Sequence, residues 1–497
     1  MDQAHPAEDA QEVITLVDSF KRITKHSLIY GLGSIIGNVI SFFLIPLYTR
    51  FLTTADYGIL SSMSAVESVL TIFFTLALHG AVLKFYFDYT GTKRKEMISS
   101  IWFFQMLFAI ILSILLYFYS GTLAKIVFKD LQMQPYLKLV VIRVFFSIGA
   151  LIPLALYRAQ EKSLRFIFFI LLTAILGVFL NIYFVVILKK GALGSLQGGV
   201  ITAVILFILY LLFFYKDTNF CFRLDIIYKA LLFSLPLVPH LLGGWIMNLS
   251  DRVLLQRLSS ARELGLYALG CNFALILSIV VLAINNAWVP FFFSVAEKKE
   301  GQITVSKLLT YYFLFICLIA LALSIFSKEI TTIMAAVNYR EAYRVIPVIV
   351  LSYIFQGMYF MSANCLFFKE KTKQLPFITC ISAVTNIVLN ILWIPRYGMM
   401  GAAWATVIAY AMFYAITHHV SKRFYALHYE KARFLKIILV AVVVYIISMH
   451  IKTEKFLYSI SVKTALMLGY FLLLYIFRFF KQEEIHNLKK LLGLPRV

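Results

Sequence analysis

The chain has 497 residues, of which 61% are hydrophobic and only 14% are charged, and its formal net charge is +22. Soluble domains carry far more charge, so this composition excludes an ordinary soluble protein and indicates that the bilayer is the solvent. The basic residues separate apolar runs instead of forming patches with exposed aromatics, which argues against nucleic-acid binding and favours topology signals and anchors to lipid headgroups.

The start of the chain and its cysteines carry further expectations. Residues 1–26 are polar and include Glu8, Asp9 and Glu12, so they predict a cytoplasmic tail and no cleavable signal peptide. The five cysteines form no CxxC or other metal-type cluster, so disulfides and zinc are not expected. We expect neither a metal nor a cofactor.

Apolar runs bounded by charges, Pro and Gly predict an all-α polytopic membrane protein with about fourteen transmembrane helices. Six are expected at 27–48, 57–82, 97–119, 136–156, 166–188 and 193–215, six more at 228–249, 264–290, 304–327, 342–367, 376–395 and 399–420, and a last pair at 434–450 and 457–478. The corresponding domains are an N-terminal six-helix bundle (27–217), a C-terminal six-helix bundle (228–425), two extra helices (434–480) and a C-terminal tail (481–497).

The distribution of Lys and Arg predicts the topology. Cytoplasmic loops carry an excess of basic residues. When the N-terminus is placed inside and the spans alternate, the inner segments hold most of the Lys and Arg, including Lys93-Arg94-Lys95 and the lysines of 369–373. An even number of spans with both termini in the cytoplasm is therefore favoured.

An internal repeat relates the two predicted bundles. The segment Glu161-Lys162-Ser163, with Asn181 and Gly191-Ala192-Leu193-Gly194 after it, recurs as Glu370-Lys371-Thr372, Asn390 and Gly398-Met399-Met400-Gly401. Residues 51–58 and 257–265 support the same register, so the repeat is about 208 residues long and contains six spans. An even number of spans makes it a parallel repeat, and we expect the transport path between its halves, with spans 1, 2, 7 and 8 lining it.

Several motifs in the expected order carry a family resemblance. They are Tyr30-Gly31, Ile45-Pro46-Leu47-Tyr48-Thr49-Arg50-Phe51-Leu52 with Tyr57-Gly58, Phe233-Ser234-Leu235-Pro236-Leu237-Val238-Pro239 before Ser250-Asp251-Arg252, Glu263-Leu264-Gly265-Leu266-Tyr267-Ala268, Ala287-Trp288-Val289-Pro290-Phe291, and Lys371-Thr372-Lys373 through Asn386 and Asn390 to Gly398-Met399-Met400-Gly401-Ala402-Ala403. With these residues, the chain resembles the oligosaccharide flippase (Wzx-type polysaccharide transporter) family of the multidrug/oligosaccharidyl-lipid/polysaccharide exporter superfamily over essentially all of residues 27–480.

The resemblance implies two pseudo-symmetric six-helix bundles around a central cavity, with two extra helices at the C-terminus. It also implies alternating-access export of an oligosaccharide linked to polyprenyl pyrophosphate, such as an O-antigen, capsule or exopolysaccharide repeat unit. The expected location is a bacterial plasma (inner) membrane, and the expected partners are this substrate, membrane lipids and a polysaccharide polymerase or ligase.

An anionic headgroup needs positive charge along its path, and ionisable residues inside spans are functional candidates by default. Arg143 lies within the fourth span and can donate two parallel hydrogen bonds to a phosphate. The alternative is a structural ion pair with Glu67 of the second span. The sequence leaves these two interpretations open.

The seventh span carries a polar stripe. His240, Gly244, Asn248 and Asp251 follow at helical steps after Pro236 and Pro239, which predicts one face directed at the cavity. Further candidates for contact with substrate are Arg252, Arg50 and Lys84 near span ends, Asn38 in a stripe of the first span, and Asn272. Interfacial anchoring is the alternative for the three cations.

Energy coupling needs a titratable or cation-binding group in the membrane. Few acidic or titratable side chains fall within spans, and we expect Glu67, Asp251 and His240 to be the candidates for a proton or sodium site. Glu67 has the alternative role of neutralising Arg143.

Two other functions compete with flipping. A multidrug or organic-cation exporter of the related branch would favour a cavity rich in carboxylates, which this sequence lacks. A membrane polymerase or ligase would need a large outer loop with acid/base groups, whereas no outer connection exceeds about 20 residues and no nucleophile, paired-carboxylate or metal motif is present. No enzymatic activity and no catalytic residues are therefore expected.

Overall fold

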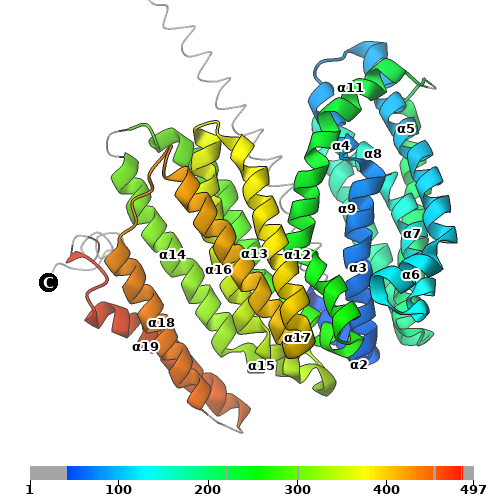
Figure 1. Cartoon of the computed structure of the whole chain (residues 1–497). Helices are drawn as coiled ribbons and strands as arrows, with labels where there is room; N and C mark the ends of the chain where they lie inside the picture. Colours follow the sequence, from blue (N-terminus) through cyan, green and yellow to red (C-terminus); the bar gives the residue numbers. More distant parts are fainter. Residues whose placement is uncertain (1–41, 220, 299–300, 452–454, 483, 485–497) are drawn as a thin grey trace, which may run out of the picture. The chain divides into compact units, whose positions relative to one another are not determined.

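The computed structural model describes residues 42–219, 221–298, 301–451, 455–482 and 484. In these ranges the chain is helical and contains no strand, which confirms the predicted all-α class (Figure 1). The predicted tail 1–26, most of the first span (27–48) and most of the C-terminal tail lie outside the described residues.

The chain divides into two compact units, residues Met1–Leu242 and Gly243–Val497. The first unit contains α2 (Ile45–Phe51), α3 (Thr54–Thr75), α4 (Leu78–Phe85), α5 (Gly91–Phe118), α6 (Ser120–Phe128), α7 (Gln134–Ile148), α8 (Leu151–Ala159), α9 (Ser163–Asn181), α10 (Gly191–Phe214) and α11 (Leu224–Ser234). The boundary falls within α12 (Val238–Leu258). The second unit continues with α13 (Ala261–Val295), α14 (Gly301–Ile325), α15 (Ser327–Met334), α16 (Ile346–Phe368), α17 (Leu375–Ser421), α18 (Lys431–His450) and α19 (Phe456–Ile476).

Twelve segments of the described residues are long and apolar enough to cross a membrane. Each overlaps a predicted span, and the segment Thr372–Ser421 contains two, at 376–395 and 399–420. The count of fourteen stays a prediction, because the first span falls mainly outside the described ranges.

The long helix α17 is two helices joined by a sharp turn. Gly398 has a left-handed backbone, with φ of 53°. The hydroxyl of Thr385 lies 3.3 Å from the sulfur of Met412, so the halves run back along each other, as the yellow and orange parts of α17 show (Figure 1). The predicted pair of spans is therefore an antiparallel hairpin.

The equivalent hairpin of the first unit is made by α9 and α10. Gly191 again has a left-handed backbone, with φ of 56°, and the Ser195 hydroxyl donates to the Asn181 side-chain carbonyl at 2.6 Å. Between Asn181 and Gly191 the chain forms a π-helix, Ile182–Ile187. The interval from Asn181 to Gly191 is two residues longer than that from Asn390 to Gly398, and the wider π-helical turns lie within the longer interval.

Two predicted spans are less regular than the sequence suggests. The span 57–82 is broken at Leu76 and Ala77, which both have left-handed backbone conformations and separate α3 from α4. The span 228–249 begins in α11, passes through a 3₁₀ turn at Leu235–Leu237 and continues as α12. Pro236 lies in that turn, as expected for a residue that removes a helical hydrogen bond.

Burial differs between helices in the way a membrane protein requires. In the apolar window of Ser163–Ile187 only 6% of residues are buried, whereas 61% are buried in that of Gly301–Ile325. Exposed apolar side chains of α9 would be unfavourable in water but suit contact with lipid, while α14 lies inside its unit. A buried ion pair between Glu329 of α15 and Lys463 of α19, 2.7 Å long, attaches the last helix to the second unit.

Candidate functional site

An ion pair between Arg143 and Glu67, one of the two alternatives that the sequence leaves open for Arg143, is present in the first unit. Nη1 of Arg143 on α7 lies 3.2 Å from Oε2 of Glu67 on α3, and the two side chains are 35% and 21% exposed. The pair is thus half-buried, and it occupies one of the guanidinium nitrogens. Of the two open interpretations, the structural pair is therefore formed in this conformation, while the remaining exposure leaves the cation accessible to an incoming anion.

A glycine on α10 provides the space for this guanidinium. A Cβ atom at Gly199 would lie 3.1 Å from Cζ, Nε and Nη1 of Arg143. Such a distance is tighter than ordinary van der Waals contact, so any larger residue at 199 must displace the arginine. The backbone of α10 therefore determines where the charge of α7 lies.

The acidic candidate of the second unit, Asp251, is buried on α12 and only 5% exposed. Its carboxylate accepts a short hydrogen bond from the hydroxyl of Tyr267 on α13 and a 2.8 Å bond from the backbone N–H of Arg252. The side chain of Arg252 is half-buried, and its Nε has no hydrogen-bond partner among the described residues. A buried carboxylate and a buried guanidinium nitrogen thus lie on consecutive residues.

A chain of hydrogen bonds extends from Asn248 across four helices of the same unit. The Tyr410 hydroxyl donates to the Asn248 carbonyl oxygen at 2.8 Å. Gln356 Nε2 lies 3.5 Å from that hydroxyl, and Gln356 accepts a 2.9 Å bond from Ser278. The chain joins α12, α17, α16 and α13 through polar groups in an otherwise apolar bundle.

Two asparagines of the last family motif extend the polar region near Asp251. The carbonyl oxygen of Asn386 accepts from Ser250 at 3.3 Å and from Asn390 at 3.0 Å. Nδ2 of Asn386 and Oδ1 of Asn390 are buried and have no hydrogen-bond partner in the part of the chain that the structure describes. Unpaired polar atoms are costly in a protein interior, so this region has unused capacity for a polar ligand.

The other predicted residues are more dispersed. Lys84 of α4 places its ammonium 4.4 Å from the ring of Phe233, and Arg50 is exposed at the end of α2, so both positions suit interfacial anchoring. His240 is exposed and lies about 16 Å along α12 from Asp251, which separates these two coupling candidates. Asn272 is half-buried on α13. Asn38 lies outside the described residues.

Two tyrosines of these clusters, Tyr410 and Tyr267, were not predicted as site residues from the sequence. Both are fully or nearly fully buried, and a buried tyrosine usually has a hydrogen-bond partner. That rule predicts that a tyrosine buried within an apolar span has a polar partner, but it does not say which helix provides that partner. Across the described ranges, no three His, Cys, Asp or Glu side chains converge on a metal site.

Comparison with known proteins identifies the class to which this fold and these clusters belong. A family model described as "Polysaccharide biosynthesis protein" matches residues 23–296, more than half of the chain, and the chain belongs to this family. A second model, MatE, matches residues 236–392. The predicted membership in the multidrug/oligosaccharidyl-lipid/polysaccharide exporter superfamily is thereby confirmed, and the protein is a multi-span membrane transporter of that superfamily.

Relatives and solved structures agree with this assignment. An uncharacterised membrane protein of Haemophilus influenzae is 24% identical over 425 residues, covering 82% of this chain and 100% of that protein. A putative O-antigen transporter of Shigella flexneri is 23% identical over 231 residues, covering 43% of this chain and 52% of that protein.

Among structures, lipid II flippase MurJ in its inward closed conformation matches with a TM-score of 0.69 at 18% identity, covering 91% of this chain and 99% of that chain. An inward-facing multidrug resistance MATE family transporter of the MOP superfamily matches with a TM-score of 0.60 at 11% identity, covering 81% and 96%. These likenesses at low identity show the fold.

Proposed function

We propose that this protein translocates an oligosaccharide linked to polyprenyl pyrophosphate across a bacterial plasma membrane by alternating access. Family membership and the Shigella flexneri relative support a polysaccharide cargo. The observation that carries the proposal is the half-exposed Arg143, which has one ion pair among the described residues, in a chain with 46 Lys and Arg but only 24 Asp and Glu. The cargo is a repeat unit of a surface polysaccharide, and both termini face the cytoplasm.

The ion pair gives this proposal a mechanism. Arg143 is neutralised by Glu67 when no cargo is bound, which lowers the cost of keeping a guanidinium within the membrane. A pyrophosphate carries more charge and more acceptor oxygens than a carboxylate, and guanidinium binds it through two parallel hydrogen bonds. The cargo therefore competes with Glu67 for Arg143, and the released carboxylate becomes free to take up a proton.

Asp251 is the second element of the proposed mechanism. A buried carboxylate is costly unless it is paired or protonated, so exchange of a proton or sodium ion at Asp251 would change the stability of the second unit. Tyr267 links that change to α13, and Asn386 and Asn390 provide amide groups close by on α17. Cargo binding in one unit and ion exchange in the other would then drive alternating access together.

The experiment is transport into sealed vesicles that contain the purified protein and a fluorescent lipid-linked oligosaccharide. Translocated cargo is protected from a membrane-impermeant glycosidase, and the expected result is protection that depends on active protein. Equal protection in vesicles without protein would contradict the proposal.

A multidrug or organic-cation exporter is the second candidate, because the MatE model matches residues 236–392 and Asp251 is a buried carboxylate. Ethidium accumulation in cells that express the protein separates the two functions. Reduced accumulation without any glycan phenotype would favour the exporter.

A polysaccharide polymerase or ligase is proposed as a partner of the flippase, acting on its product.

A further inference from the structure

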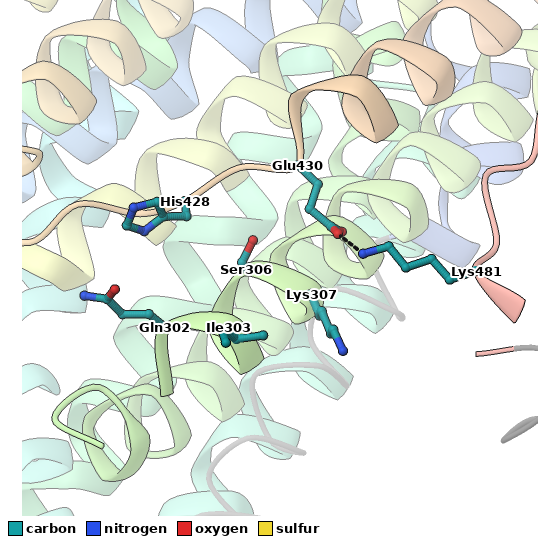
Figure 2. A pocket seen from close by; sticks show the side chains of 7 residues that line it. All are labelled: Gln302, Ile303, Ser306, Lys307, His428, Glu430 and Lys481. Carbon is teal, nitrogen blue, oxygen red and sulfur yellow. Dashed lines mark hydrogen bonds and ion pairs between the residues drawn. The ribbon is translucent and has the colours of Figure 1, made fainter. Parts of the chain in front are cut away.

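A small pocket lies in the second unit, and none of its lining residues belongs to the sites described above. Its volume is about 340 Å³. Gln302, Ile303, Ser306 and Lys307 of α14, His428 and Glu430 of the connection before α18, and Lys481 beyond α19 line it (Figure 2). Three segments distant in sequence thus contribute donors and cations to one small space.

The acidic residue of the pocket is already fully engaged. Oε1 of Glu430 accepts from Lys481 at 2.7 Å, and Oε2 accepts from Arg433 at 2.8 Å and from Thr310 at 2.9 Å. Burial acts to raise the pKa of Glu430, but the hydrogen bonds from Lys481 and Thr310 and the charge of Arg433 outweigh burial and lower it below its usual value. The carboxylate stays ionised and neutralised by these partners.

The remaining pocket groups favour an anion. Lys307 is exposed and has no ion-pair or hydrogen-bond partner within the described ranges. Ser306, Gln302 and His428 add hydrogen-bond donors, and Lys481 already points into the pocket toward Glu430 (Figure 2). Phosphate oxygens are suitable acceptors for such a set of lysine and hydroxyl donors.

The place of the pocket decides between sources of phosphate. It is built at the start of α14, just before α18 and just after α19, and all three positions fall on the predicted cytoplasmic side of the membrane. Ile303, 61% exposed, adds an apolar surface next to the cations. Basic pockets between transmembrane helices on the cytoplasmic side suit anionic lipid headgroups. A soluble anion has no apolar part that could pack against the isoleucine.

We propose that this pocket binds the phosphate of an anionic phospholipid headgroup, with Lys307 and Lys481 as its cationic contacts and Ile303 beside the glycerol backbone. The site is separate from the cargo and depends on the predicted topology. A bound lipid would connect α14 to the chain on either side of the last two helices, and thereby stabilise the attachment of α18 and α19.

The test is lipid binding to the purified full-length protein, measured by native mass spectrometry during titration with phosphatidylglycerol or zwitterionic phosphatidylethanolamine. Wild-type protein should prefer phosphatidylglycerol, and Lys307→Gln should weaken its binding about fivefold, the effect of one lysine near an anionic surface. Lys307→Gln with Lys481→Gln should weaken it further. Lys373→Gln is the matched control, because Lys373 is exposed on the same predicted side but does not line the pocket.

Two outcomes would overturn the proposal. One is equal loss of phosphatidylglycerol binding in Lys373→Gln, which would indicate general surface attraction. The other is unchanged binding in Lys307→Gln, a variant that leaves the pair of Lys481 and Glu430 intact and should fold normally. Displacement of the lipid by millimolar inorganic phosphate, with no effect of replacing Ile303 by serine, would assign the pocket to a soluble anion and overturn the lipid assignment.

Discussion

Asp56 in the first unit and Glu263 in the second accept equivalent backbone hydrogen bonds. Asp56 accepts from the N–H of Ala192 at 3.1 Å, and Glu263 accepts from the N–H of Met399 at 2.9 Å, in each case 136 residues further along the chain. Both acids are the third residue of their helix, and the capping residues Thr53 and Ser260 bond to their backbone N–H groups. An acid at the start of α3 or α13 thus holds the turn of a hairpin far away in sequence.

This shared contact explains two glycines of the repeat. The bonded N–H follows Gly191 in the first unit and Gly398 in the second, and both glycines have a left-handed backbone. A Cβ at Gly191 would lie 2.9 Å from Oδ1 of Asp56, and one at Gly398 would overlap Oε2 of Glu263. Glycine is therefore required twice over, for its backbone conformation and for the approach of the acid.

We predict that Gly398→Ala destabilises the second unit, because the new methyl group meets Glu263 and the left-handed backbone becomes strained. Such strain costs about 1–3 kcal/mol, so the unfolding temperature in detergent should fall clearly. Gly469→Ala in α19 is the control, since no atom lies within 4 Å of the position that its new methyl group would occupy. An unfolding temperature equal for the two variants would contradict this account of the turn.

The second prediction concerns Arg433, which binds two carboxylates at the end of the second unit. Its guanidinium lies 2.8 Å from Glu430 and 2.9 Å from Glu484. Burial acts to raise the pKa of Glu484, but hydrogen bonds from the Lys481 backbone and Arg433 lower it overall. A carboxyl with a lowered pKa stabilises the fold above its ordinary unfolded pKa, about 4.3, and this contribution is lost as the pH falls through the folded value.

We therefore expect Glu484→Gln to reduce thermal stability at pH 7, and the difference from wild type to shrink as the pH falls below about 4.3. Thermal unfolding in detergent between pH 7 and about pH 3.5 brackets that ordinary value and measures the difference. A gap that is constant across the range would show that the carboxylate charge of Glu484 does not stabilise this contact. Glu297→Gln is a suitable control, because this exposed acid has no ion pair among the described residues.

Much of the fold could be predicted from the sequence, because long apolar runs have few alternatives to membrane helices. The break at Leu76 and Ala77 could not, since neither residue is Gly or Pro and a left-handed backbone is unfavourable for other L-residues. The hydrogen bond from Tyr267 to Asp251 joins neighbouring helices at facing positions, which hydropathy does not encode. The pair of Arg143 and Glu67 could be named from the sequence only as one of two alternatives, because two opposite charges in nearby spans have few other partners but the sequence does not place them in contact.

The third prediction is that Gly199 positions Arg143. Gly199→Ala should displace the guanidinium and reduce export several-fold at matched membrane abundance, because the added methyl group would lie 3.1 Å from three of its atoms. Gly177→Ala on α9 is the control, with no atom near its Cβ position. Lysine has no planar guanidinium group for the methyl group to displace, so Gly199→Ala should impair the Arg143→Lys protein less than it impairs wild type. An equal loss of export in the wild-type and Arg143→Lys backgrounds would show that Gly199 acts only through helix packing and does not position Arg143.

The final prediction separates a headgroup-binding Arg143 from one that only neutralises Glu67. If Arg143 binds the pyrophosphate, Arg143→Ala should reduce export at least about tenfold, since a hydrogen bond to a charged group contributes about 1.5–3 kcal/mol. Arg143→Lys should recover part of the activity, because lysine keeps the charge but loses the bidentate geometry. Arg143→Ala also strands the Glu67 carboxylate in a half-buried position, so folding and insertion must be measured for every variant.

The double variant Arg143→Ala with Glu67→Gln resolves the ambiguity, because it removes the stranded charge together with the cation. Recovery of export to the wild-type level would show that the arginine serves only its partner. Loss of export in the double variant and in Arg143→Ala, with normal abundance and unfolding temperature, is the result we expect. Glu67→Gln alone removes the carboxylate partner of Arg143, so this variant should bind cargo more tightly and release it more slowly. A titration of vesicle transport against cargo concentration would detect these effects as a lower half-saturation concentration and a lower maximal rate.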